Sequence, residues 1–474
     1  MATLKMIIDL FGASILVPIV VLILSLFLRV KFKDALRGAI FMGIGLAAFN
    51  IILGSLMASL GPAVNTMVEN TGINLPVIDL GWPAAAVIVY ANQIGLFYLV
   101  FGVFFDLLLF LTRWTDTFHP TDIWNYYQFV FWAAIVQLVT GSFWLGIVFA
   151  MYANLILLLI ADWLAPAIQE YYGYDGITNT TCASTNCAPF AIVAKWILIK
   201  LRIYDIKLNP ERLKERFGFW GEPISMGLII GLVIAIIANL PKIGTLEGWS
   251  NILQTAIITG AVMALYPAVS GLFVKGLIPI SQTLNSRIRK GEIKRDNFYI
   301  SMDSAVLFGE EATLTTGLLL IPIILLISVI LPGNIILPLA DLPAMPFMVI
   351  GIVTVMRGNI LSALITGAVW YGAAHWCNSD IASVFTQAAI NSGVEMPAAG
   401  SMVSAWSIGN NPLLWLAYKA FAAPEGIRFV TIAIAIAVYL IVYFFFRKNR
   451  RAWQMAAGAS EEFMNNLEDR RART

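Results

Sequence analysis

The chain has 474 residues, of which 59% are hydrophobic and only 12% are charged, and its mean hydropathy is +0.81. A soluble domain of this size needs far more charge to cover its surface, so the composition excludes an ordinary soluble protein. The formal net charge of +2 gives no indication of nucleic-acid binding, because the basic residues flank apolar runs.

Long uncharged runs recur along the chain, and about 20 consecutive apolar residues are enough to cross a bilayer. The runs cover residues 10–28, 38–68, 80–105, 123–161, 223–241, 248–274, 312–340, 358–379 and 429–446. The run at 123–161 is long enough for two spans, with residues 141–146 as the turn. We therefore predict an all-α polytopic membrane protein with about 10–11 transmembrane helices, and no cleavable signal peptide.

Basic residues predict the orientation of the chain. They concentrate in four segments, at residues 29–37, 195–216, 287–295 and 447–451. The connectors at 170–187 and 245–251 contain no Lys or Arg. Because Lys and Arg are retained on the cytoplasmic side, we expect the basic segments and the C-terminal tail to be cytoplasmic.

The basic segment also separates two apolar halves of comparable length. We divide the chain into a first transmembrane repeat (1–194), a basic cytoplasmic loop (195–221), a second repeat with the last helix (222–446) and a cytoplasmic tail (447–474). The loop either only orients the chain or also helps to dock a soluble partner.

The two halves carry similar landmarks in the same order. In each half, a span that follows a proline-containing helix leads to an amphipathic stretch and then to an aspartate, Asp79 or Asp303. A second aspartate, Asp122 or Asp341, follows beside a short irregular segment. Internally repeated transporters have this pattern, with the binding site at interrupted helices between the repeats. An odd number of spans in the first half would make the repeats inverted.

Asp79 and Trp82 are the first candidate site residues, because an ionisable residue in apolar surroundings is costly unless it is used. In the segment NLPVIDLGWPAAA, Pro83 and Gly81 predict a break in the chain at membrane depth. The break exposes backbone groups that a polyol could use, and Trp82 offers a flat face for the C–H surface of a sugar. Trp82 could equally belong to the interfacial aromatic belt.

Asn125 and Gln128 lie at the start of the next helix and share one face of it. Such an amide face can make paired hydrogen bonds to vicinal hydroxyls, or it can be polar contact between helices. Asn186 lies in the polar segment NTTCASTNCAP. That segment is either a re-entrant loop that lines a cavity or a plain external loop.

In the second half, Asp303 is favoured as a site residue for the same reason as Asp79. Glu310 and Glu311 precede a long uncharged run. They could line a hydrated cavity that binds substrate, carry a proton, or cap the following helix. Of these, we predict that at least one of the pair binds substrate, and we include both among the substrate-binding residues.

Several kinds of chemistry have no support in the sequence. The three cysteines are sparse and are better explained as packing residues than as a disulfide pair. His119 and His375 are the only histidines and neither lies near a ligand cluster, so we expect no metal and no other cofactor. The chain has no P-loop, and no nucleophile with a base that would indicate a catalytic site.

Five motifs together resemble one known family. They are DLGWP at 79–83, DIWN at 122–125, RFGFWGEP at 216–223, VILPGNIILPLADL at 329–342 and RGN at 357–359. In combination they resemble the galactitol-family IIC proteins of the phosphoenolpyruvate-dependent phosphotransferase system, over residues 8–447.

The resemblance implies a sugar or polyol permease of the bacterial inner membrane that works with soluble IIB and, indirectly, IIA subunits. The related ascorbate IIC proteins are homodimers with inverted repeats and interrupted helices, and we expect the same fold here. Their ligand contacts match Trp82, Asn125, Asn186 and Asp303 in this sequence. The alternative is an ion-coupled secondary transporter of a small polar solute, with Glu310 and Glu311 as proton carriers.

Overall fold

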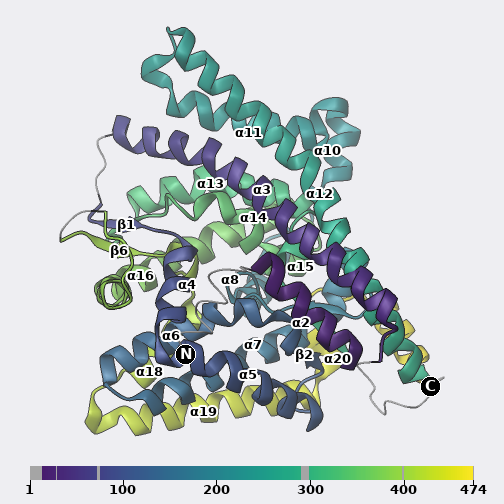
Figure 1. Cartoon of the computed structure of the whole chain (residues 1–474). Coiled ribbons are helices and arrows are strands. Elements are labelled where there is room, and N and C mark those ends of the chain that lie inside the picture. The colour runs from purple at the N-terminus through teal and green to yellow at the C-terminus, as the bar shows by residue number, and fades with distance from the viewer. Residues whose placement is uncertain (1–12, 28, 72–74, 290–297, 398–399, 473–474) are drawn as a thin grey trace.

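The computed structural model describes residues 13–27, 29–71, 75–289, 298–397 and 400–472, and most of them are helical (Figure 1). Among these residues, eight helices are long and apolar enough to cross a membrane, or nine if the bent pair Pro210–Trp220 and Ile224–Ala238 forms one span. The prediction of an all-α polytopic membrane protein is confirmed.

The number of described full-length spans is lower than the 10–11 that we predicted, because several apolar runs are broken into shorter helices. The run at 80–105 divides at Asn92 into α4 (Trp82–Ala91) and α5 (Gln93–Leu111), and α4 has only 10 residues. The run at 123–161 divides, as expected, at Gly141 and Ser142 into α6 (Tyr126–Thr140) and α7 (Phe143–Tyr172).

The first half of the chain alternates long helices with short strands and breaks. Its elements are α2 (Ala13–Phe27), α3 (Phe32–Thr71), β1 (Val77–Asp79), α4, α5, β2 (Thr117–Phe118), the 3-10 helix η1 (His119–Asn125), α6, α7, β3 (Ile177–Asn179), α8 (Cys182–Thr185) and α9 (Ala188–Lys200). The basic loop then forms α10 (Pro210–Phe217) and η2 (Gly218–Gly221).

The second half repeats this order. Its elements are α11 (Pro223–Ala238), η3 (Leu240–Lys242), α12 (Leu246–Arg289), β4 (Tyr299–Met302), η4 (Ser304–Val306), α13 (Glu311–Ile330), β5 (Ile336–Leu337), η5 (Leu342–Ala344), α14 (Met345–Met348), α15 (Ile350–Met356), α16 (Ile360–Asn391), β6 (Met402–Ser404), α17 (Trp406–Gly409) and α18 (Pro412–Phe421). We infer from the shared order that the halves are repeats; their inverted orientation stays a prediction.

The strands interlock the two halves. β1 of the first half lies between β5 and β6 of the second, and β4 of the second half lies between β2 and β3 of the first. All four pairings are parallel. Each three-stranded sheet therefore takes its centre from one half and its edges from the other, so the halves form one intertwined unit.

Asp79 holds the first sheet together at the end of β1. Its two carboxylate oxygens accept hydrogen bonds from four backbone N–H groups, those of Gly81, Ala340, Asp341 and Trp406, at 2.9–3.1 Å. These groups belong to three chain segments that have left regular secondary structure. A buried backbone donor without a partner is costly, so one carboxylate stabilises the whole crossing.

The break that Gly81 and Pro83 predict is confirmed. Gly81 has a φ of 75°, and a side chain there would place Cβ 3.0 Å from Oδ1 of Asp341. Asp341 accepts from the backbone N–H groups of Trp82 and Ser407, at 2.9 and 2.8 Å. The start of α4 is thereby tied to the start of α17.

The long helices α3 and α12 lie side by side, and α12 also packs against α11, on one side of the molecule (Figure 1). α3 and α12 approach closely at Gly38 and Gly276, where a Cβ on Gly38 would lie 2.5 Å from the carbonyl oxygen of Gly276. On another side, α19 (Glu425–Lys448) leaves most of its surface outside the protein, as a lipid-facing span does.

The tail that follows α19 forms α20 (Arg450–Ala456) and α21 (Glu461–Ala472), and it is anchored to the helical core. Arg450 pairs with Asp116. Arg357 pairs with Glu170 at 2.9 Å, and Glu170 also accepts from the backbone N–H of Ser460 at 2.7 Å. These contacts hold the tail against the ends of α7 and α15.

The role of Asp79 predicts that its replacement is destabilising. Asp79→Asn turns one acceptor oxygen into an NH₂ group that faces backbone donors, and each donor left unpaired costs roughly 1–3 kcal/mol. We expect a clearly lower melting temperature of the purified protein. The matched control is Asp380→Asn, on the surface beside Lys419, where such a pair contributes at most about 1 kcal/mol. Equal melting temperatures for both variants would contradict this role.

Candidate functional site

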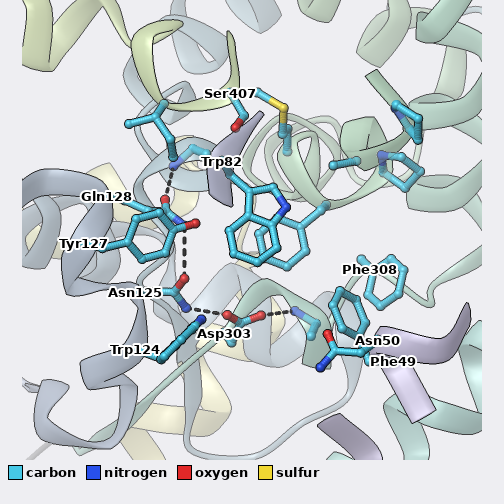
Figure 2. A pocket seen from close by; sticks show the side chains of 18 of the residues that line it. Phe49, Asn50, Trp82, Trp124, Asn125, Tyr127, Gln128, Asp303, Phe308 and Ser407 are labelled. Atoms are coloured by element: carbon cyan, nitrogen blue, oxygen red, sulfur yellow. Dashed lines mark hydrogen bonds between the residues drawn. The ribbon is translucent and has the colours of Figure 1, made fainter. Parts of the chain in front are cut away.

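A cavity of about 210 Å³ lies where α3, η1 and the starts of α4, η4 and α17 meet (Figure 2). Its polar lining side chains are Asn50, Asn125, Gln128, Asp303 and Ser407. Its aromatic lining side chains are Phe49, Trp82, Trp124, Tyr127, Phe308 and Phe347. Both halves of the chain contribute, so the cavity exists only in the interlocked fold.

A chain of hydrogen bonds connects the polar residues of the cavity. The backbone N–H of Ala183 donates to Oε1 of Gln128, and Nε2 of Gln128 donates to Oδ1 of Asn125, both at 3.0 Å. Nδ2 of Asn125 then donates to Oδ2 of Asp303, and the backbone N–H of Ala305 donates to its Oδ1 at 2.6 Å. Figure 2 shows Asn125 between Gln128 and Asp303. From Ala183 through Gln128 and Asn125 to Asp303, each residue donates a hydrogen bond to the next one. These bonds fix the orientation of the Gln128 and Asn125 amides.

Asp122 supports this chain from behind the cavity wall. Its Oδ1 accepts from Nδ2 of Asn125 at 2.8 Å, and its Oδ2 accepts from the hydroxyl of Thr180 at 2.7 Å. Both hydrogens of the Asn125 amide are therefore used on carboxylates. In the same segment, the hydroxyl of Thr121 donates to the carbonyl of Ser301 in β4 at 2.8 Å, which holds η1 against the second sheet.

Burial raises the pKa of both carboxyls that hold Asn125, and these carboxyls lie between the spanning helices. For Asp122, the nearby charge of Asp303 raises the pKa further, while the Thr180 hydroxyl opposes the shift. For Asp303, the hydrogen bonds from Ala305 and Asn125 oppose the shift. The hydrogen bonds from the protein therefore stabilise the charged form of each carboxyl against the cost of its burial.

Aromatic rings form the other walls of the cavity. Trp82 lies against Tyr127, with ring centroids 6.2 Å apart, and Trp124 lies against Tyr90, with centroids 5.7 Å apart. The backbone N–H of Trp82 is fixed by Asp341, as described above. Flat apolar faces beside amides and a carboxylate suit a solute with hydroxyls on one side and C–H groups on the other.

The structure thus brings together four of the eight predicted substrate-binding residues, Trp82, Asn125, Gln128 and Asp303, around one cavity. Asp79 is buried but does not line it, because its carboxylate is directed to backbone N–H groups at the crossing. Asn186 is buried one helical turn beyond the lining residue Ala183, and its Nδ2 donates to Asn411 at 3.3 Å.

Glu310 and Glu311 do not line the cavity either. Glu310 caps α13, since its carboxylate accepts from the backbone N–H groups of Ala312 and Thr313, each at 2.9 Å, and from the Thr313 hydroxyl at 2.7 Å. Glu311 is the first residue of α13 and is exposed. The helix-capping interpretation, one of the three left open by the sequence, describes Glu310.

Several lining residues were absent from the predicted site. Tyr127 lies between two predicted positions, and Asn50 is a polar residue inside the apolar run of α3. A search for uncharged polar residues within spans would have found Asn50. Phe308 and Ser407 carry no such signal, because only the packing of η4 and α17 against α3 and α4 brings them to the cavity.

The cysteines and the potential metal ligands of the described residues form neither a disulfide nor a metal site. All three cysteines are buried and free, so Cys182 and Cys187 are not paired. Within the described part of the chain, no group of three or more His, Cys, Asp or Glu side chains could hold a metal ion.

Residues 6–400 match the family described as "PTS system sugar-specific permease component". The chain belongs to this family. It is 31% identical to the "PTS system galactitol-specific EIIC component" of Escherichia coli strain K12 over 448 residues, which cover 94% of this chain and 95% of that protein. It is also 29% identical to a "Putative permease IIC component" of the same strain over 438 residues, 92% of this chain and 97% of that protein.

Membership in this permease family confirms the resemblance seen in the motifs. The chain is a multi-pass protein of the bacterial inner membrane, the sugar-translocating component of a phosphotransferase system that also has IIA and IIB components. The ion-coupled secondary transporter is not favoured, since the family couples transport to phosphorylation.

Asp303→Asn tests the cavity as the place where this permease holds its substrate. The change keeps the shape of the side chain but removes the charge that strengthens hydrogen bonds from substrate hydroxyls, each worth roughly 1.5–3 kcal/mol. We expect sugar affinity, measured by calorimetry, to fall about tenfold or more. Expression and elution on size exclusion should remain as in the wild type. Unchanged affinity in such a well-folded variant would give Asp303 a structural role.

Glu310→Gln separates helix capping from substrate binding. Loss of the charged cap should lower stability by about 1 kcal/mol and leave sugar affinity at the wild-type value. Glu311→Gln, one position along and exposed, is the matched control and should change neither property. A change of sugar affinity in either variant would instead support the prediction that this pair contacts the substrate.

Proposed function

We propose that this permease carries galactitol or a closely related polyol or sugar, bound through Trp82, Asn125, Gln128 and Asp303. The observation that carries the proposal is the single hydrogen-bonded chain from Gln128 through Asn125 to Asp303 along one cavity. The galactitol-specific component with 31% identity over 94% of this chain supports the substrate class.

The hydrogen-bonding capacity left in the cavity suits hydroxyl groups. Asp303 has one hydrogen bond on each oxygen within the protein, so each oxygen can accept another from a hydroxyl. Gln128 uses one of its two amide hydrogens, on Asn125, and can donate the second. A vicinal diol, which both donates and accepts, can meet an acceptor and a donor placed side by side.

In the proposed cycle the substrate enters this cavity from outside and is released towards the cytoplasm as a phosphate ester. A phosphorylated cysteine of the IIB subunit transfers its phosphoryl group. The substrate hydroxyl oxygen forms the new bond to phosphorus, the sulfur–phosphorus bond breaks, and the hydroxyl proton is lost. The charged product cannot return through an apolar membrane, which makes uptake irreversible. In this scheme the IIC chain binds and moves the substrate and carries no phosphoryl group itself.

We further propose that the basic loop and the tail both lie in the cytoplasm, where the loop can dock IIB. Nζ of Lys195 donates to the carbonyl of Val355 at 2.8 Å, and Arg357 donates to the carbonyl of Gly458 at 3.2 Å. The second half of α9, the end of α15 and the tail therefore lie together, and this region carries basic residues. A homodimer, as the resemblance implies, is part of the same proposal.

The coupling mechanism is tested by uptake in vesicles. We expect accumulation of labelled galactitol to require phosphoenolpyruvate together with the general phosphotransferase components and the cognate IIA and IIB, and to persist for minutes after a protonophore is added. Vesicles that lack IIB are the matched control and should not accumulate the label. Accumulation by the purified chain alone, driven by an imposed proton gradient, would overturn the proposal.

A further inference from the structure

Two short helices end in asparagines at equivalent places of the two halves. α8 follows β3 and has Asn186 as its C-terminal cap residue, and α17 follows β6 and has Asn410 as its C-terminal cap residue. Both side chains are buried, with exposed fractions of 1% and 3%. The two helix ends meet at Asn411, the residue that follows Asn410. Nδ2 of Asn186 donates to Oδ1 of Asn411 at 3.3 Å.

The amides of these two asparagines are incompletely bonded. Oδ1 of Asn186 has no hydrogen-bond partner, and neither does Oδ1 or Nδ2 of Asn410. Buried polar atoms are rarely left without a partner in the protein or an ordered guest molecule. Three such atoms, on the last residues of two short helices whose ends meet, therefore indicate that a polar molecule binds in this region.

A third asparagine nearby shows what a structural role looks like in this region. Asn378 of α16 has an exposed fraction of 0%. Its Nδ2 donates to the carbonyl of Trp406 at 3.3 Å, and its Oδ1 accepts from the hydroxyl of Ser404. Asn378 thus uses both ends of its amide, on Ser404 of β6 and on Trp406 at the start of α17, whereas Asn410 at the end of α17 uses neither.

The two incompletely bonded amides lie one helical turn beyond the cavity wall. Ala183 of α8 and Ser407 of α17 both line the cavity. Asn186 and Asn410 follow them by three residues, and residues three apart lie on the same side of a helix. Both short helices therefore lead from the cavity to the amides.

We propose that Asn410, together with Asn186, forms a second polar end of the substrate site and binds hydroxyl groups of the polyol or sugar. This inference rests on the proposed function. An amide supplies one donor and one acceptor side by side, which matches two neighbouring hydroxyls. A polyol with a hydroxyl on every carbon can meet Asp303 at one end and Asn410 at the other. Asn410 is then a specificity-determining residue that reads hydroxyls distant from Asp303.

The test compares Asn410→Ala with Asn378→Ala, a matched change of an equally buried asparagine. Binding is measured by calorimetry with galactitol and with both enantiomers of its 1-deoxy, 2-deoxy and 3-deoxy analogues. A chiral site distinguishes the two ends of this meso polyol, so these six analogues are needed to remove each hydroxyl once. A site built to bind a hydroxyl discriminates strongly against an analogue that lacks it. In Asn410→Ala we expect galactitol affinity to fall about tenfold, and the penalty for one deoxy analogue to disappear.

The stability of the ligand-free protein is the second measurement. Asn410→Ala removes polar atoms that have no partner, so the melting temperature should not fall. Asn378→Ala breaks two hydrogen bonds, so its melting temperature should fall while the pattern of deoxy penalties stays as in the wild type. All six penalties unchanged in Asn410→Ala, with a lower melting temperature, would overturn the inference and assign the amide to bound water. A wild-type protein that binds none of the seven probes would overturn the proposed function and this inference with it.

Discussion

Unwound backbone inside a membrane protein must satisfy its N–H and C=O groups without water, and this constraint shapes the centre of the molecule. The chain leaves helical structure near β1, before η5 and before α17, and each break frees backbone donors. Asp79 and Asp341 accept six of those backbone N–H groups between them. Because the donors come from both halves, the same hydrogen bonds that satisfy the breaks also interlock the repeats.

The second sheet meets the same constraint in a different way. Asp303 follows its central strand, as Asp79 ends the central strand of the first sheet, and Asp122 follows an outer strand, as Asp341 does. Here, however, the carboxylates are partly satisfied by side chains, those of Asn125 and Thr180. The cavity lies beside Asp303 and Asn125, which both line it. One aspartate pair is thus a structural tie, and one member of the equivalent pair, Asp303, lines the cavity where we propose that substrate binds.

The proposed site would bind a neutral, flexible polyol with few charges. The amides of Gln128 and Asn125 are turned by a one-way series of donors that begins at the backbone of Ala183. Their orientation is therefore set before a ligand arrives, which lowers the ordering cost of binding. The rings of Trp82 and Tyr127 complete a pocket that matches hydroxyls on one side and C–H groups on the other.

The sequence by itself determined the membrane class, the break at Gly81 and Pro83, the turn at Gly141, the repeated order of landmarks and the family. Each of these depends on local composition or on short motifs. It also selected Trp82, Asn125, Gln128 and Asp303, because polar or aromatic residues beside helix breaks stand out against an apolar background.

Only the tertiary structure decided what each buried acid does. Asp79 and Asp303 have the same signal in the sequence, but whether a carboxylate faces backbone donors or a cavity depends on segments more than 170 residues away that pack against it. Glu310 caps α13 through its own neighbours, yet that geometry depends on the exact start of the helix. The meeting of Asn186 with Asn411, and with it the unpaired amide of Asn410, arises from the crossing of the two halves, which no local pattern encodes.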